Sequence, residues 1–169
     1  VKLSFGLAAA GITVVSGMAR GIDACAHRGA LDAGGRSIAA LGCGVDIFYP
    51  SENKSLMERM IKEGAVVSEY LPGTLPMPYH FPARNRIISG MAAGVVVVEA
   101  GERSGSLITA DFAAEQGRDV FAVPGNANSV KSLGSDQLIK DGAKITTGIE
   151  DILEEMVGYE KKAKRENPV

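Results

Sequence analysis

The sequence of 169 residues contains no tryptophan and only two cysteines, Cys25 and Cys43. Neither cysteine belongs to a CxxC motif or has His or Cys neighbours at metal-ligand spacing, so we expect neither a disulfide framework nor a metal site. No apolar run approaches the roughly 18 residues of a membrane span, and the first residues do not follow a signal-peptide pattern. These absences favour a reduced, cytoplasmic protein that is not attached to a membrane.

A large excess of charge of one sign is also absent. The 18 Lys and Arg residues nearly balance the 20 Asp and Glu residues, which gives a formal net charge of −2. This excludes the globally basic surface of many nucleic-acid modules, so any polyanion site has to be a local patch. The sequence is rich instead in small and apolar residues, with 46% hydrophobic residues and 21 glycines, as the close packing of α/β layers requires.

Short runs rich in β-branched residues alternate with segments of helical period. This alternation predicts a doubly wound, mostly parallel sheet with helices on both faces, an extended Rossmann-like α/β fold. We expect one domain over residues 1–157, with a charged linker or tail over residues 158–169. Asn53 is the expected N-cap of the second helix. The expected strands are 12–16, 37–42, 65–69, 95–100, 119–124 and 143–147, and the expected helices are 22–33, 52–63, 84–92, 107–117, 135–141 and 149–157.

Polar and small residues gather in the loops that follow the expected strands, where an open parallel sheet binds its ligands. In the first such loop, "SGMARGID", a phosphate cradle at a helix N-terminus and an ordinary turn are both open interpretations. The loop does not match G-x-G-x-x-G, and neither does "LGCG", so we expect no dinucleotide cofactor. Its phosphate-binding candidates are Ser16, Gly17, Arg20 and Gly21.

The longest stretch without a regular period is residues 69–86, "EYLPGTLPMPYHFPARNR". Here Phe81 could stack on a base while Arg84, Asn85 and Arg86 contact the phosphate backbone. Alternatively, Phe81 fills the core and the arginines are surface charges. Two arginines in the first turn of a helix oppose the helix dipole unless an anion lies nearby, which favours the binding hypothesis.

The segment "ERSGSLITA", residues 102–110, joins an apolar strand to a helix. A serine nucleophile would need the G-x-S-x-G pattern, which is missing, and the Asp23–His27 spacing is more typical of a hydrogen bond on a helix surface. We therefore predict no catalytic residue here and interpret the segment as one wall of a phosphate groove. The candidates in this segment and in the later loop "PGNANS" are Arg103, Ser104, Gly105, Ser106, Gly125 and Asn126.

Seven motifs occur in order between Gly11 and Leu153: "SGMARGIDACAHRGAL", "AALGCGVDIFYP", "SEYLPG", "HFPARNRIISG", "ERSGSLITA", "EQGRDVFAVPGN" and "LIKDGAK". Through them the chain resembles the DNA-processing protein A family (DprA, also called Smf). The resemblance implies a Rossmann-like domain that binds single-stranded DNA without an enzymatic step. It also implies protection of incoming strands during natural transformation, loading of the RecA recombinase, and a homodimer with Leu138, Ile139 and Ile145 at its interface.

The chain also departs from the family pattern. Members open with a strand that ends in a "GSR"-type loop, so we expect the first strand of the family's domain to be missing here. An alternative function is that of a nucleotide-binding enzyme, because the "lonely guy" nucleoside-monophosphate phosphoribohydrolases have a similar fold. Their "PGGxGT" signature is not found in "VPGNANS". A pure interaction module is a third possibility.

Overall fold

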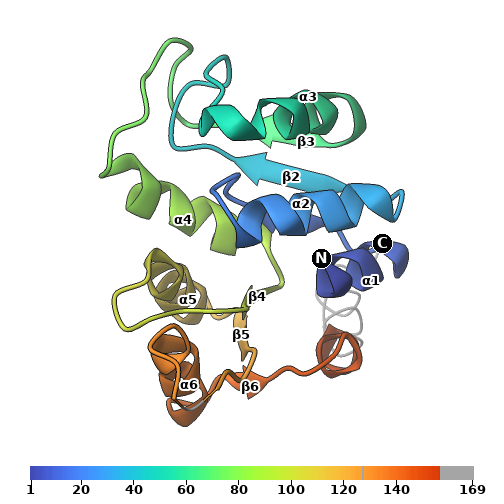
Figure 1. Cartoon of the computed structure of the whole chain (residues 1–169), viewed down its shortest axis with the longest axis vertical. Helices are drawn as coiled ribbons and strands as arrows, with labels where there is room; N and C mark the ends of the chain where they lie inside the picture. The colour runs from blue at the N-terminus through green and yellow to red at the C-terminus, as the bar shows by residue number, and fades with distance from the viewer. Residues whose placement is uncertain (127, 157–169) are drawn as a thin grey trace, which may run out of the picture. The chain divides into compact units, whose positions relative to one another are not determined.

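The computed structural model describes residues 1–126 and 128–156. The chain divides into two compact units, one from Val1 to Met91 and one that begins at Ala92. Each unit consists of parallel strands joined by helices (Figure 1). The expected linker over residues 158–169 lies outside the described residues.

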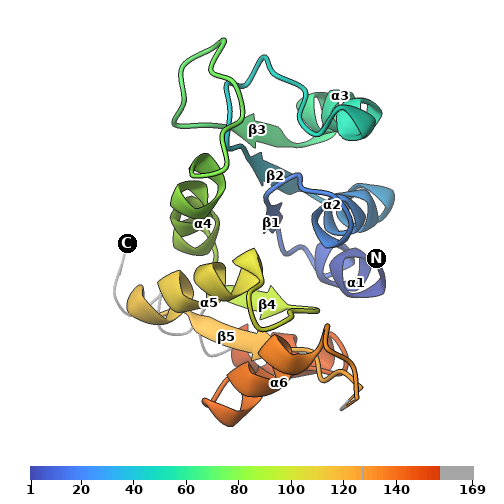
Figure 2. The same ribbon diagram turned by 60° about the vertical axis from the view of Figure 1, so that its left-hand side comes forward.

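The first unit contains a three-stranded parallel sheet in the order β1-β2-β3. Helices α1, α2 and α3 lie in a row on one face of this sheet, whereas α4 contacts β1 and β2 from the other face (Figure 2). The strands are β1 (Val14–Ser16), β2 (Ser37–Ala40) and β3 (Ala65–Val67). The helices are α1 (Lys2–Ala9), α2 (Ile22–Asp32), α3 (Lys54–Glu63) and α4 (His80–Met91), with a short 3-10 helix η1 (Ser51–Asn53) before α3.

The core of the first unit forms where α2 and α3 pack on the sheet. Met57 and Met60, three positions apart on α3, are buried together with Leu31 of α2 and Leu41 beyond β2. Because this spacing places apolar side chains on one face of the helix, α3 covers the sheet with its apolar stripe. Cys43 is 1% exposed, so it is a buried side chain rather than a surface thiol.

The second unit also has a three-stranded parallel sheet, in the order β4-β5-β6. The alanines of α5 and the valines of β4 form its core, since small helix residues allow a close approach to the strand. Gly94 has a similar role, because a Cβ there would lie 2.9 Å from the buried ring of Phe121. The elements are β4 (Gly94–Val97), α5 (Gly105–Glu115), β5 (Asp119–Ala122), α6 (Leu133–Lys140), β6 (Lys144–Ile145) and a helical segment over residues 150–156.

The expected parallel α/β architecture is confirmed, and each of the six expected strands is present. Helix α1 was not expected, because its sequence has little amphipathic pattern. It forms against α2, where Gly29 leaves room for Ser4: a Cβ on Gly29 would lie 2.2 Å from the Ser4 Oγ. No helix in the described part of the chain is long and apolar enough to cross a bilayer.

Helix α4 begins at His80, four residues before the expected start. Pro82 does not prevent this, because proline is tolerated in the first turn of a helix, where the N–H has no intrahelical partner. The earlier start places Phe81 on the helix, together with Arg84 and Arg86, which were expected there. The helical period then decides which of these side chains face the sheet.

Candidate nucleic-acid site

The loop after β1 is closed by the carboxylate of Asp23. The Ser16 hydroxyl donates to Asp23 Oδ1 at 2.8 Å, and the backbone N–H groups of Gly17 and Ala19 donate to Oδ2 at 3.2 and 3.1 Å. The loop therefore has the anion-binding geometry that the sequence indicated, but an internal carboxylate already occupies it. Of the two interpretations of this loop, a phosphate cradle stays a prediction, since in this structure Ser16 and Gly17 donate to Asp23.

Arg84 lies behind this loop and is only 4% exposed. Its Nη1 donates to the carbonyl oxygen of Gly17 at 2.8 Å and to that of Ala40. Burial lowers the pKa of the Arg84 guanidinium, and the negative charge of Asp23 partly opposes this effect. In this structure the side chain joins the carboxyl ends of β1 and β2, so a phosphate contact of Arg84 stays a prediction that its burial does not favour.

The helical period explains the different positions of the neighbouring α4 side chains. His80 and Arg84 are four residues apart and both buried, so they share the face that packs on the sheet. Asn85 is 9% exposed and its Oδ1 accepts from Arg84 Nε at 3.2 Å. Arg86 points away from this face: its side chain is 50% exposed and pairs with Glu69. Of the α4 candidates for phosphate contact, only Arg86 reaches the surface.

A cavity of about 340 Å³ lies at the carboxyl ends of β1 and β2, within the first unit. The half-buried Phe81 lines it and stacks on Tyr49, with ring centroids 5.6 Å apart and an interplanar angle of 29°. Gly42 makes this position possible, since a Cβ there would lie 2.9 Å from the Phe81 ring. Phe81 is therefore neither a fully buried core residue nor a free surface ring but part of the wall of a cavity.

Arg20 lines the same cavity, and its side chain is 65% exposed. The guanidinium pairs with Glu52, with Nε next to Oε1 and Nη2 3.1 Å from Oε2. The hydrogen bond that Arg20 donates to Glu52 raises the pKa of Arg20, and the same bond lowers the pKa of Glu52. Arg20 is thus an accessible cation at a cavity with aromatic walls. Gly21, which follows it, starts α2 with a positive φ of 78°.

Asn53 has a role that the sequence did not indicate. It makes no side-chain hydrogen bond as a helix cap. Its Nδ2 instead donates to the carbonyl oxygens of Met18 and Ala19 at 2.9 and 3.3 Å, and the side chain is only 5% exposed. The expected capping role is therefore wrong: Asn53 fastens η1 to the loop that carries Arg20.

In the second unit, Ser104 caps α5. Its Oγ accepts from the Ser106 backbone N–H at 3.4 Å and lies 2.8 Å from the Ser106 Oγ. Both serines are half-buried, whereas Arg103 and Gly105 are exposed. An N-cap serine followed by an exposed helix N-terminus accounts for the polar character of "ERSGSLITA". The exposed Arg103 is the cation of this segment.

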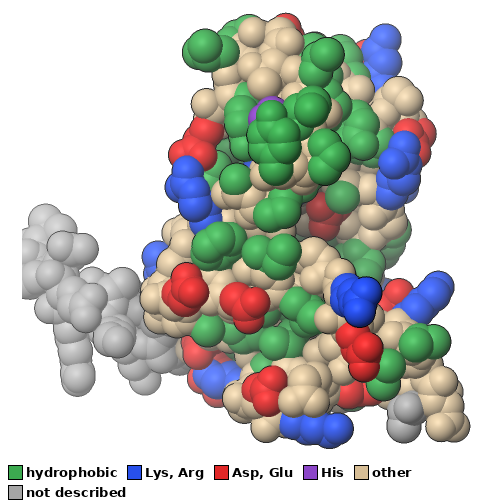
Figure 3. Space-filling view, turned by 90° about the vertical axis from the view of Figure 1, so that its left-hand side faces the viewer, with side chains coloured by type: hydrophobic (Ala, Val, Ile, Leu, Met, Phe, Trp, Pro, Cys, Tyr) green, Lys and Arg blue, Asp and Glu red, His purple; other side chains and the backbone are tan. Residues whose placement is uncertain are grey.

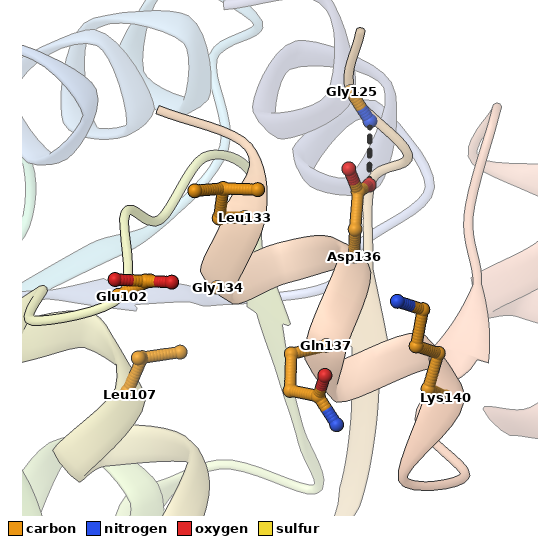
Figure 4. A pocket seen from close by; sticks show the side chains of 8 residues that line it. All are labelled: Glu102, Leu107, Gly125, Leu133, Gly134, Asp136, Gln137 and Lys140. Atoms are coloured by element: carbon orange, nitrogen blue, oxygen red, sulfur yellow. Dashed lines mark hydrogen bonds between the residues drawn. The ribbon is translucent and has the colours of Figure 1, made fainter. Parts of the chain in front are cut away.

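The loop after β5 repeats the pattern of the loop after β1. Gly125 donates its backbone N–H to Asp136 Oδ1 at 3.2 Å, while Asn126 is exposed. Next to this contact, an open cavity of about 640 Å³ is lined by Glu102 and by residues of α6 (Figure 4). Its lining contains the carboxylates of Glu102 and Asp136 beside a single amine, that of Lys140. This cavity has no excess of positive charge.

The distribution of charge agrees with a local rather than a global basic site. On the face shown in Figure 3, Lys and Arg side chains are scattered among Asp and Glu. The side chains that remain accessible to a polyanion are therefore individual residues at the strand ends. Among the sequence candidates these are Arg20, Arg86, Arg103 and Asn126.

His27 is buried rather than part of a surface pair with Asp23. It is 0% exposed, and its Nδ1 lies 2.8 Å from the Ser37 Oγ, which donates to the carbonyl oxygen of Val14 at 2.9 Å. Because the single hydroxyl proton of Ser37 goes to that carbonyl, Nδ1 of His27 must be the donor. Burial lowers the pKa of His27 to about 4, which keeps the ring neutral at pH 7. Within the described residues, no group of three or more His, Cys, Asp or Glu side chains could hold a metal ion.

The dimer candidates differ in accessibility. Ile145 is 54% exposed on β6, at one end of the strand order in its sheet. Leu138 is half-buried and packs against the core of the second unit, and Ile139 is also half-buried. Of the three, Ile145 is the side chain that a partner could cover with the least change in the unit itself.

Comparisons with known proteins agree with this architecture. DNA processing protein DprA of Streptococcus pneumoniae is 51% identical over 144 residues, which is 85% of this chain and 51% of the relative. The chain thus spans about half the length of this relative. The X-ray structure of the S. pneumoniae protein matches with a TM-score of 0.85 at 49% identity, over 91% of this chain and 54% of that chain.

A second solved structure, DNA processing protein A of Helicobacter pylori, has a TM-score of 0.84 at 29% identity. The match covers 92% of this chain and 71% of that chain, and the H. pylori protein is described as having a unique single-stranded DNA binding mode. The sequence model of the family described as DNA recombination-mediator protein A matches residues 1–157. The chain therefore belongs to the DNA recombination-mediator protein A family.

Proposed function

We propose that this chain binds single-stranded DNA at the carboxyl ends of its parallel strands, without an enzymatic step. The observation that carries the proposal is the 340 Å³ cavity of the first unit, which combines the stacked rings of Tyr49 and Phe81 with the accessible Arg20. Aromatic faces accept the bases of an unpaired strand, and a neighbouring cation neutralises its phosphates. The single-stranded DNA binding ascribed to the H. pylori relative supports this assignment.

We assign the role of each residue in DNA binding from the exposure of its side chain. Arg20 and Arg86 in the first unit, and Arg103 in the second, contact phosphates. Phe81 offers its ring to a base. Buried Arg84 and Asn85 keep the loop and α4 in position and do not meet the strand directly. The remaining proposed contacts come from the hydroxyl groups of Ser104 and Ser106 and from Asn126, whereas the backbone N–H of Gly125 already donates to Asp136.

Binding of this kind has a defined dependence on salt. Each phosphate neutralised by a cation releases counterions, so the logarithm of the affinity falls linearly with the logarithm of salt concentration, by about 0.7 per contact for a single strand. Fluorescence anisotropy with a labelled oligonucleotide measures this slope. We expect Arg20→Ala to weaken binding and to reduce the slope by about 0.7.

Phe81→Leu tests the stacking contact. It should weaken binding with no change in the slope, because a base contact releases no counterions. Arg28→Ala is the matched control, since Arg28 is exposed on α2 and does not line the cavity. Equal losses in Arg20→Ala and Arg28→Ala would show that only the general charge matters, and the assignment of the cavity would then be wrong.

The wider role that we propose follows from family membership. The chain would protect incoming single strands during natural transformation in the cytoplasm and help load RecA onto them, acting as a homodimer. The measurement is RecA filament formation on DNA coated by a single-strand-binding protein, with and without the full-length parent protein. Release of free base from nucleoside monophosphates would instead support the alternative of a phosphoribohydrolase.

A further inference from the structure

The cation at the rim of the cavity already has an anionic partner. Arg20 pairs with Glu52 through two contacts, from Nε to Oε1 and from Nη2 to Oε2 at 3.1 Å. Glu52 itself does not line the cavity. The pair therefore draws the guanidinium toward η1, in the same two-pronged geometry with which arginine binds a phosphate.

The position of Glu52 is determined by its neighbour in the chain. Asn53 is buried and holds η1 against the loop of Arg20 through its hydrogen bonds to the carbonyl oxygens of Met18 and Ala19. Arg20 is the residue that follows Ala19. The two segments that carry Arg20 and Glu52 are thus held together by the buried side chain of Asn53, next to Glu52 in the chain.

The Arg20–Glu52 pair also differs from the closure of the loop by Asp23. Asp23 accepts from the Ser16 hydroxyl and from two backbone N–H groups, and the backbone donors keep their positions when side chains move. The side chains of Arg20 and Glu52 are 65% and 51% exposed. Breaking this ion pair therefore costs little free energy, because water can solvate both charged groups. A ligand phosphate can therefore replace Glu52 but not Asp23.

We propose that Glu52 is an intramolecular competitor for the phosphate that Arg20 binds, so that a DNA strand has to displace this carboxylate to occupy the site. The inference rests on the proposed function, since it concerns the same arginine and the same strand. Glu52 then lowers the affinity for DNA and limits occupation of Arg20 by small anions. Its removal should tighten binding, whereas removal of most acidic residues elsewhere should have little effect.

The test compares Glu52→Gln with Glu58→Gln in the anisotropy assay at low salt. Glu58 is a matched control, because it is 52% exposed, lies on α3 beside Lys54 and carries the same charge. We expect Glu52→Gln to bind the oligonucleotide about threefold more tightly, as the strength of exposed ion pairs suggests, and Glu58→Gln to bind as the wild type does. The difference should shrink at high salt, since screening weakens the pair.

A second pair of variants identifies the partner of Glu52. In an Arg20→Ala background, Glu52→Gln should give no gain, because the arginine for which it competes is absent. A gain that persists in that background, or equal gains in Glu52→Gln and Glu58→Gln, would overturn the inference while leaving the proposed function intact. If the wild type binds DNA and Glu52→Gln binds it no more tightly, the inference is likewise overturned and the proposed function is retained. Absence of binding in all variants would overturn both.

Discussion

Nη1 of Arg84 on α4 donates a hydrogen bond of 2.8 Å to the carbonyl oxygen of Gly17, 67 residues earlier in the chain. The guanidinium also lies above the ring of Phe81, with its Cζ 5.9 Å from the ring centroid. One buried cation thus connects the loop after β1 with a wall of the cavity. We therefore expect the proposed DNA site to depend on this contact, although the Arg84 side chain is buried.

Gly17→Ala should disturb this contact directly. A Cβ on Gly17 would lie 2.6 Å from Nη2 of Arg84 and 2.8 Å from Oδ2 of Asp23, so one of these side chains has to move. We expect a loss of about 1–3 kcal/mol in the free energy of unfolding, as for other overpacked sites, measured by denaturant titration. Gly105→Ala is the control, because a Cβ there meets nothing within 4 Å. Similar stabilities for the two variants would contradict the prediction.

Arg84→Met separates a structural role from a phosphate contact. The carbonyl oxygens of Gly17 and Ala40 would lose their charged donor in a buried site, so we expect a loss of about 1–3 kcal/mol in stability. The salt slope of DNA binding should stay that of the wild type, unlike the slope of Arg20→Ala. A reduced slope with unchanged stability would show that Arg84 does contact phosphate.

The buried histidine gives the protein a defined pH dependence. The pKa of His27 is about 4 in the folded chain and about 6.5 when unfolded. Below pH 6.5 the unfolded state therefore binds the proton first, and stability falls as the pH decreases toward 4. The slope attributable to His27 approaches about 1.4 kcal/mol per pH unit in this range.

Unfolding measured between pH 7 and 5 isolates this effect, because most carboxylates stay ionised there. His27→Gln lacks the titrating ring, so its stability should change much less over the same interval. The same decline in the variant and in the wild type would show that other groups cause it.

Ser104→Ala should weaken the start of α5. The hydrogen bond from the Ser106 N–H to Ser104 Oγ is long, at 3.4 Å, so we expect a loss at the lower end of the usual range for N-caps, about 0.5–1 kcal/mol. Ser104→Asp should recover this stability, since aspartate is also a good cap, while its charge should weaken DNA binding. Loss of stability in both variants would argue against the capping role.

Ile145→Glu and Leu138→Glu should affect different properties. Ile145 is exposed, so its replacement should reduce dimer formation, as measured by light scattering, and leave the stability of the monomer nearly unchanged. Leu138 packs against the core of the second unit, so its replacement should destabilise the fold itself. A fully dimeric Ile145→Glu variant would remove Ile145 from the interface.

The sequence alone predicted the main elements, apart from α1, and the sheet edge at which we propose the site. Apolar β-branched runs and helical periods are local patterns, and they predicted all six strands. Ligands bind beyond the carboxyl ends of parallel strands, and this rule predicted a site in the loops with Arg20 and Phe81. Both residues line one cavity in the structure. The seven ordered motifs likewise identified the family that the comparisons confirm.

Only the tertiary structure decided which polar residues are accessible. Arg84 and Arg86 are two positions apart in the sequence, yet one is buried and the other is half exposed. The helical period lets only one of these side chains face the sheet, and the carbonyl partners of Arg84 that fix this choice are 67 and 44 residues away along the chain. Local patterns specify periodicity, whereas the partner of a polar group depends on segments that only folding brings together.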